Sequence, residues 1–185
     1  MKKSISFSLK ALTFIFIAGI CIQASCKHMG SQEKKAVAII SATKADFPAS
    51  GIIKFEQEKD GKVEMKLELT IPGKANQSVA VHFHEHGMCG NEGNDAHGHW
   101  NPTNTQHGKW GSSSFHAGDV GNITLDANGK GKLTLESDLW TIGGDEKTNI
   151  LNRGVIVHGG VDDYSTQPTG NSGPRIACGV IMMKQ

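Results

Sequence analysis

Apolar and polar residues alternate most regularly from Val63 to Ile71, in the run VEMKLELTI. Every second residue is apolar, and the residues between them are Glu, Lys or Thr. A period of two predicts a β-strand with one face in the core and the other in water. The pair Asp60-Gly61 stands directly before this run and favours a tight turn, so we expect a hairpin with the preceding strand.

Other apolar runs, rich in β-branched residues, predict further strands. We expect them over residues 35–43, 50–57, 79–84, 155–158 and 175–183. A second hairpin is expected where residues 123–125 and 133–135 flank the turn pair Asn128-Gly129, and residues 137–151 are expected to form a loop. About eight strands and no convincing helix predict an all-β fold. We expect an eight-stranded antiparallel Greek-key β-sandwich or flattened barrel with long loops.

The first 25 residues have the pattern of an export signal. Lys2 and Lys3 precede an apolar stretch over residues 11–22 that is too short for a comfortable membrane span. Ala24, Ser25 and Cys26 then resemble the lipobox of bacterial lipoproteins, although Gln23 stands where an aliphatic residue is usual. We expect cleavage before Cys26, lipidation of that residue and anchoring in the periplasm or cell envelope. The alternative is plain cleavage near Ala24, which would give a soluble secreted protein.

Composition limits the rest of the chain to one ordinary domain. The 185 residues are 37% hydrophobic and 20% charged, with a formal net charge of +1. We therefore expect a polar linker over residues 26–34 and one domain over residues 35–185. The near-neutral charge gives no reason to expect a nucleic-acid partner. We expect contact with a membrane only through the lipid anchor on Cys26.

Histidines are concentrated in one part of the chain. Seven of the nine lie between His82 and His116, and Asp119 follows closely. His82 and His84 are two residues apart in a predicted strand, so their imidazoles project from one face. The other spacings are irregular and include a cysteine, which argues for a folded site rather than a low-complexity tract. Imidazoles with one carboxylate predict a site for zinc or copper.

The cysteines point to a disulfide bond. Of the four cysteines, Cys21 would be removed with the signal and Cys26 would be acylated, which leaves Cys89 and Cys178. An exported protein permits disulfides, so we expect these two to pair and tie the histidine-rich segment to the last strand. Closing so long a loop is worth about 4–5 kcal/mol in the chain-entropy model.

Five motifs together resemble the Cu,Zn superoxide dismutase family. They are FHEHG, HWNP, HGKWGSSSFHAGDVGNI, VIVHGGVDDY and GPRIACGVI, and the resemblance covers residues 36–181. It implies one copper and one zinc ion per chain. The implied copper ligands are His82, His84, His99 and His158, and the implied zinc ligands are His99, His107, His116 and Asp119, so that His99 bridges the two ions.

The resemblance also implies roles for residues outside the ligand set. Asp162 would hydrogen-bond one copper ligand and one zinc ligand, and Arg175 would draw the anionic substrate toward copper. Cys89 and Cys178 match the disulfide of the family. The implied reaction is dismutation of superoxide to dioxygen and hydrogen peroxide, with His99 passing a proton and Arg175 as the second catalytic residue. Both a monomer and a homodimer are open.

Some residues depart from the family pattern. His86 and His97 match no ligand position, and we expect them at the surface or rim, with an auxiliary metal contact as the alternative. Residues 159–174 lack the dense charge of a steering loop. A rival reading is a non-enzymatic exported module that binds copper or zinc, but the presence of every copper position and Arg175 favours the enzyme. A third reading, an adhesin, lacks support because we find no exposed aromatic platform.

Overall fold

A computed structural model describes residue 1 and residues 34–185. The expected signal segment, Cys26 and all of the linker except Lys34 lie outside the described residues. The strands are β1 (Lys35–Ala42), β2 (Ser50–Gln57), β3 (Val63–Thr70), β4 (Ser78–His84), β5 (Gly121–Thr124), β6 (Lys130–Ser137), β7 (Gly154–His158), β8 (Arg175–Val180) and β9 (Met182–Met183). Two short 3₁₀ helices, η1 (Pro72–Lys74) and η2 (Asn91–Ala96), join them. No helix among the described residues is long and apolar enough to cross a membrane.

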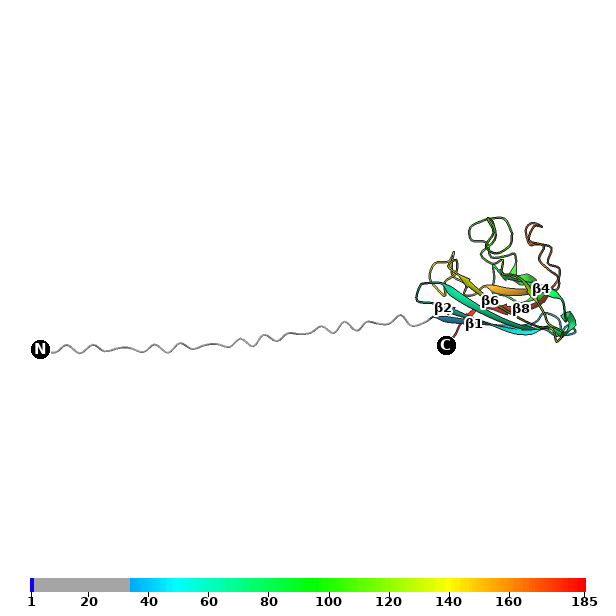
Figure 1. Ribbon diagram of the computed structural model, residues 1–185, viewed down its shortest axis with the longest axis horizontal. Coiled ribbons are helices and arrows are strands. Elements are labelled where there is room, and N and C mark those ends of the chain that lie inside the picture. The colour runs from blue at the N-terminus through cyan, green and yellow to red at the C-terminus, as the bar shows by residue number, and fades with distance from the viewer. Residues whose placement is uncertain (2–33) are drawn as a thin grey trace. The chain divides into compact units, whose positions relative to one another are not determined.

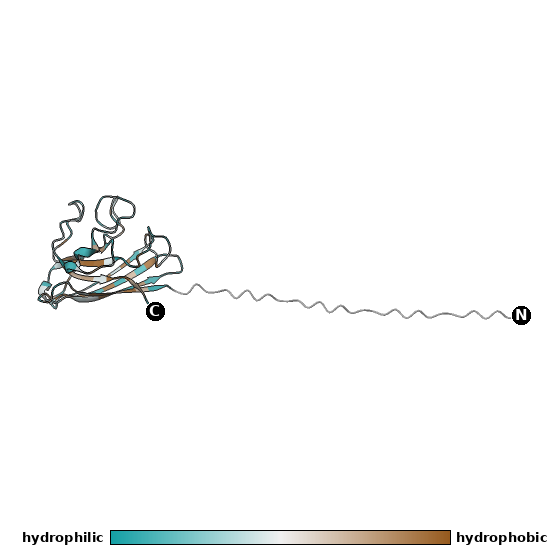
Figure 2. Ribbon diagram, turned by 180° about the vertical axis from the view of Figure 1, so that it is seen from behind, coloured by the Kyte–Doolittle hydropathy of each residue, from teal (hydrophilic) through white to brown (hydrophobic). Residues whose placement is uncertain are grey.

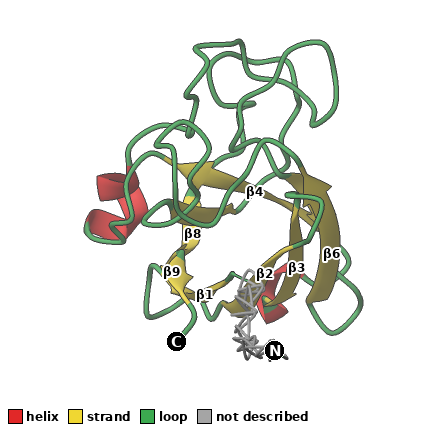
Figure 3. Cartoon of the chain, turned by 90° about the vertical axis from the view of Figure 1, so that its left-hand side faces the viewer, coloured by secondary structure: helices red, strands yellow, loops and turns green. Residues whose placement is uncertain are grey.

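The strands form one antiparallel sheet that curves into a flattened barrel. Their order is β5-β4-β7-β8-β1-β2-β3-β6, and β9 pairs with β1 outside this path. Figure 3 shows the strands arranged around a ring, with long loops gathered beside β4. The predicted all-β antiparallel fold is confirmed, and β9 is an addition to the eight expected strands.

The alternation that predicted β3 is present in the structure. Along this strand Val63, Met65, Leu67 and Leu69 are buried in the core, and the residues between them are partly or fully exposed. β3 pairs with β2 through the expected hairpin, where Gly61 has φ +94° and the Lys62 N–H donates to the Asp60 carboxylate over 3.1 Å. Figure 2 shows the same alternation of hydrophilic and hydrophobic residues along the barrel strands.

One expectation about strand pairing is wrong. The turn at Asn128-Gly129 exists, and Asp126 accepts hydrogen bonds from the N–H groups of Asn128 and Lys130, but β5 pairs with β4 and β6 pairs with β3. The two strands diverge after the turn because they lie at opposite ends of the sheet order. The last strand, expected as one element over residues 175–183, is interrupted at Ile181, whose N–H donates to the carbonyl of Arg153. β8 pairs with both β7 and β1, and β9 continues along β1.

The core fills the barrel with aliphatic and aromatic side chains. Phe83 contacts the ring of Phe55 at a centroid distance of 5.8 Å and the ring of Trp140 at 5.0 Å. Trp140 belongs to the expected loop over residues 137–151, and it is fully buried with its indole N–H donating to the Ala117 carbonyl. This segment is therefore a loop by its backbone but part of the core by its side chains.

Strands β4 and β7 are buried on both faces, and they position three of the candidate ligand histidines. Val81 and Phe83 point into the barrel core, so the alternation of β4 places His82 and His84 on the opposite face. His158 ends β7, the neighbour of β4 in the sheet. The long loop between β4 and β5 and the loop between β7 and β8 rise from the same side of the barrel (Figure 1). The histidines on β4 and β7 are buried.

Candidate metal centre

Seven buried side chains form two groups that share His99. The four-histidine group contains His82, His84, His99 and His158, and the histidine–aspartate group contains His99, His107, His116 and Asp119. Within each group every residue offers one ligand atom, and these atoms lie within 4.8 Å of one another. The structure thus brings together every ligand residue that the sequence suggested.

Each strand histidine has one ring nitrogen held and one free. The Nδ1–H of His84 donates to the carbonyl of His97 over 2.9 Å, and the Nδ1–H of His158 donates to the carbonyl of Gly173 over 3.2 Å. His82 donates from Nε2 to Asp162 Oδ2 over 2.9 Å. The atoms left without a partner are therefore His84 Nε2, His158 Nε2 and His82 Nδ1.

Asp119 is the focus of the second group. His99 Nδ1 lies 2.8 Å from Asp119 Oδ1, His107 Nδ1 lies 3.0 Å from Oδ2, and His116 Nδ1 lies 3.2 Å from Oδ1. The contacts of His107 and His116 lack hydrogen-bond alignment, so their Nδ1 atoms count as unpaired. Three imidazole nitrogens with one carboxylate oxygen are a four-donor set that suits zinc.

The unpaired nitrogens show that the residues fit bound metals. Six buried ring nitrogens, one on each ligand histidine, have no hydrogen-bond partner in the described residues. Leaving a buried polar atom unsatisfied costs about 1–3 kcal/mol each. A metal ion is the partner that the two groups provide for, and the four-imidazole set suits copper as the other set suits zinc.

The electrostatics of the groups keep the ligand atoms available. Burial lowers the pKa of His84, lowers the pKa of His99 to about 4 and lowers that of His158 to about 3. These imidazoles are therefore neutral near pH 7, as metal ligands must be. Burial would raise the pKa of Asp119, but the adjacent imidazoles of His107, His116 and His99, together with the backbone N–H of His116, outweigh it and hold the pKa well below its usual value. Asp119 is thus an ionised donor.

His107 differs from the other ligand histidines. Burial lowers its pKa, but the carboxylates of Asp119 and Asp162 outweigh burial and raise the pKa to about 9. Without metal His107 is therefore protonated near pH 7. An ion entering the histidine–aspartate group must displace that proton, which makes binding there weaken as the pH falls.

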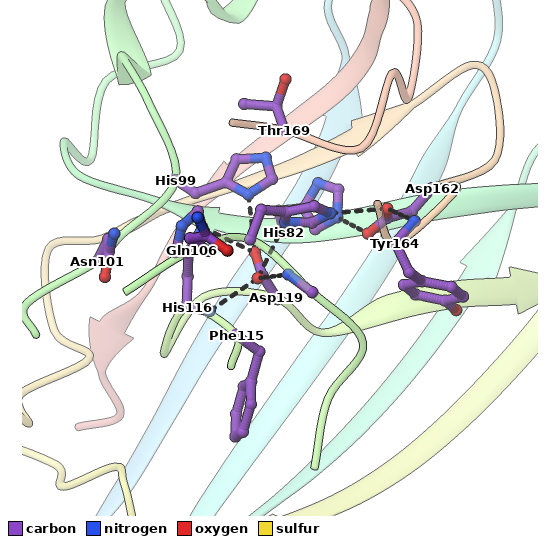
Figure 4. Close-up of polar contacts among 12 residues, drawn as sticks. His82, His99, Asn101, Gln106, Phe115, His116, Asp119, Asp162, Tyr164 and Thr169 are labelled. Atoms are coloured by element: carbon purple, nitrogen blue, oxygen red, sulfur yellow. Dashed lines mark hydrogen bonds and ion pairs between the residues drawn. The ribbon is translucent and has the colours of Figure 1, made fainter. Parts of the chain in front are cut away.

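Asp162 joins the two groups from outside. Its Oδ2 accepts from His82 Nε2 over 2.9 Å (Figure 4). Its Oδ1 accepts from His107 Nε2 over 2.8 Å. The carboxylate is placed by the backbone of its own loop, since the N–H of Tyr164 donates to Oδ1 and the Asn122 amide bonds both backbone groups of Asp162. One carboxylate therefore orients a histidine in each group.

Arg175 begins β8 beside the four-histidine group. Its Nη1 donates to the carbonyl of Gly93 and its Nη2 to the carbonyl of His97, each over 2.6 Å. The His97 carbonyl is the same one that accepts from His84, so a single peptide group positions both residues. The expected disulfide between Cys89 and Cys178 is confirmed, and it ties the segment before η2 to β8.

Several positioning groups escaped the sequence reasoning. The carbonyls of Thr105, Gly93, His97 and Gly173 hold ligand histidines or Arg175, and Gln167 pairs with both backbone groups of His107. Every residue has a backbone carbonyl, so the sequence gives no sign of which carbonyls will hold a ligand histidine or Arg175. His86 and His97 are exposed, as expected.

The fold and the two groups define a β-barrel metalloprotein with adjoining sites for two ions. The chain belongs to the copper/zinc superoxide dismutase family, whose model, described as "Copper/zinc superoxide dismutase (SODC)", matches residues 49–181.

Named relatives and a solved structure agree with this assignment. Superoxide dismutase [Cu-Zn] 1 of Aquifex aeolicus is 35% identical over 144 residues, which cover 70% of this chain and 84% of the relative. Superoxide dismutase [Cu-Zn] of Saccharomyces cerevisiae is 34% identical over 152 residues, which cover 78% and 97%. The crystal structure of the clock protein EA4 is similar with a TM-score of 0.73 and 31% identity over 85% of this chain and 99% of that one.

The double hydrogen bond of Asp162 predicts the effect of Asp162→Asn. The amide keeps the size of the side chain but offers only one acceptor, so His82 or His107 loses its partner. We expect the affinity for copper, zinc or both to fall by about 10–100-fold. Competition with chelators of graded strength measures this change.

Asp163→Asn is the matched control for that substitution. Asp163 is the neighbouring carboxylate, and its hydrogen bonds run to Ser165 and Thr166 rather than to a ligand histidine. The control should retain both metals with unchanged affinity. Equal metal affinity in Asp162→Asn and the unaltered chain would show that Asp162 does not orient the ligands.

Proposed function

We propose that this chain is an exported superoxide dismutase with residue roles set by its two buried groups. Its family membership establishes the reaction, in which two superoxide anions and two protons give dioxygen and hydrogen peroxide, and establishes copper and zinc as cofactors. We assign copper to the four-histidine group and zinc to the histidine–aspartate group. The observation that carries this assignment is that His99 belongs to both groups: its Nε2 has no partner, and its Nδ1 lies against Asp119 of the histidine–aspartate group.

The residues divide the work of the reaction between them. Copper held by imidazoles supplies one-electron redox chemistry, whereas zinc has none and serves to hold its ligands. His99 can carry a proton at Nε2, the nitrogen on the copper side, and pass it to the reduced substrate. Before metal binds, Asp119 orients the same ring by accepting a hydrogen bond from the opposite nitrogen, Nδ1.

Arg175 is the residue placed to attract the substrate. Its guanidinium is fixed by two carbonyl groups, and its positive charge is close enough to contribute, after burial, to lowering the pKa of His84 and His158. A fixed cation beside the copper ligands focuses a small anion on that site and raises the encounter rate. The non-enzymatic metal-binding module is disfavoured because the copper group and Arg175 are both complete.

The copper assignment predicts the effect of His158→Ala. His158 belongs only to the four-histidine group, so its loss should remove copper and abolish dismutation while zinc and the fold persist. Metal content by mass spectrometry and the dismutation rate are measured on one sample, after reconstitution with both metals and removal of loosely bound ions. The unaltered chain should hold about one copper and one zinc per chain.

Two further variants make that test specific. His116→Ala removes a donor of the histidine–aspartate group alone and should lower zinc content first. His86→Ala removes an exposed histidine and should leave both buried metals and the rate unchanged. An unchanged rate per copper in His158→Ala would overturn the copper assignment, and zinc alone with no turnover in the unaltered chain would favour the metal-binding module.

The role of Arg175 predicts a charge effect on the rate. Arg175→Ala should lower kcat/KM by about tenfold or more at low salt, and the dependence of the rate on ionic strength should shrink. Arg175→Lys should retain more of the rate than Arg175→Ala. Lys132→Ala, which removes an equal charge at an exposed position paired with Glu68, is the control. If Arg175→Ala and Lys132→Ala behave alike, Arg175 does not attract the substrate.

Export is supported by the signal-like sequence of residues 1–25 and by the disulfide, since disulfides are much more common in oxidising compartments than in the cytoplasm. Lipidation is supported by the lipobox-like residues that end at Cys26. We expect the full chain, produced in a bacterium that processes lipoproteins, to incorporate labelled fatty acid and to enter the detergent phase on phase separation. Cys26→Ala should still be exported but should stay in the aqueous phase. An unlabelled soluble chain outside the cytoplasm would favour plain cleavage, and retention in the cytoplasm would contradict export.

We also propose that the chain is of the bacterial exported type within the family and that it forms a homodimer. The lipobox-like residues support the first. For the second, the apolar side chains of Ile39, Met182 and Met183 are exposed around β1 and β9, and a second copy packed there would remove them from water.

A further inference from the structure

A third group of potential ligands lies outside the two buried groups. It consists of Glu85, His86 and His97, which we call the surface group, and all three residues are exposed. Each offers one ligand atom, and these atoms lie within 4.8 Å of one another. The rings of His86 and His97 meet edge to face with their centroids 4.5 Å apart. No role in the two buried groups accounts for these side chains.

The backbone brings the surface group together from two segments. Glu85 and His86 directly follow β4, and His97 directly follows η2. The Glu85 N–H donates to the carbonyl of Gly98 over 3.0 Å, and the His86 N–H donates to the carbonyl of Ala96 over 3.2 Å. The segments are therefore paired around the group. The nearby disulfide and the hydrogen bonds of Arg175 restrain the same loop.

The backbone conformation of His97 is the second sign that its side chain has a use. Its φ of 63° and ψ of −140° lie in a region that glycine adopts and that side chains disfavour. The carbonyl of His97 serves His84 and Arg175, but glycine would present the same carbonyl without strain. The imidazole is therefore retained at a cost that positioning the copper ligand does not explain.

The side chains of the surface group are free to bind a ligand. Among residues 34–185 the side chains of Glu85, His86 and His97 make no hydrogen bond and no ion pair within 4.0 Å. The Arg153 guanidinium donates to the Glu85 carbonyl and interacts electrostatically with the Glu85 carboxylate, but it leaves the carboxylate oxygens without a direct partner. Two imidazoles and one carboxylate are a recurring zinc donor set that leaves a coordination position for water. Because the three side chains are already adjacent, binding needs little further ordering.

We propose that Glu85, His86 and His97 bind a third metal ion, zinc, at the surface beside the copper group. This site is separate from the two buried ones and does not rest on how copper and zinc are assigned to them. Exposure to water makes it the weakest of the three sites. Its closeness to the His97 carbonyl means that an ion there would also restrain the loop that holds His84 and Arg175.

Calorimetric titration of the holoenzyme with zinc tests this proposal. The two buried sites are first filled and loosely bound ions are removed, so that only further binding is measured. The unaltered chain should take up about one additional zinc ion. His86→Gln should weaken that binding by about tenfold or more, without changing the buried copper and zinc or the dismutation rate.

Matched variants separate a site from a general effect of charge. Glu146→Gln removes a negative charge from the cavity that Glu146 lines together with Glu85 and His86, but it leaves the three donors in place. It should bind zinc as the unaltered chain does, whereas Glu85→Gln should bind it more weakly. His97→Gly keeps the carbonyl and relieves the backbone strain, so it should lose the third ion without losing thermal stability.

Two outcomes would overturn the proposal. The first is an unaltered holoenzyme that takes up no further zinc. The second is a third ion that binds equally well to His86→Gln, which would place it elsewhere in the chain.

Discussion

The structure of the metal centre depends on a difference between the two ring nitrogens of each buried imidazole. One nitrogen is held by a carboxylate or carbonyl, and the other is left without a partner for an ion. The first contact fixes the tautomer and the direction of the ring, and the second is unfavourable until metal is bound. The ligand set is therefore built before the metal arrives, and metal binding is coupled to the stability of the loops that carry it.

The barrel supplies the frame for this arrangement, and loop residues next to the ligands, such as Trp100 and Ala117, pack into its core. β4 and β7 present Val81, Phe83, Val155 and Val157 to the barrel interior and their histidines to the opposite face. Two rigid strands thus supply three ligands, and the long loops supply the rest. The disulfide and Asp162 then join those loops to the strands, so that a site made largely of loop residues is held as firmly as one made of strands.

The sequence predicted what depends on side-chain type and missed what depends on the backbone. The period of β3, the disulfide and the concentration of histidines were visible because apolar, cysteine and imidazole side chains each leave a pattern. The pairing of β5 and β6 was mispredicted because a turn fixes only its own residues, whereas partner strands are chosen by the closure of the whole barrel. The carbonyls of His97 and Gly173 left no pattern, because the fold alone brings them to the ligands.

The shared carbonyl of His97 couples two parts of the site. It accepts hydrogen bonds from both His84 and Arg175, so one peptide group sets the orientation of a ligand histidine and the position of the guanidinium beside it. A substitution in the loop around η2 that moves this oxygen is expected to disturb both residues at once, and the effects of several such substitutions are expected to be non-additive. A small shift of one backbone oxygen would therefore change the retention of the metal and the placement of the positive charge together.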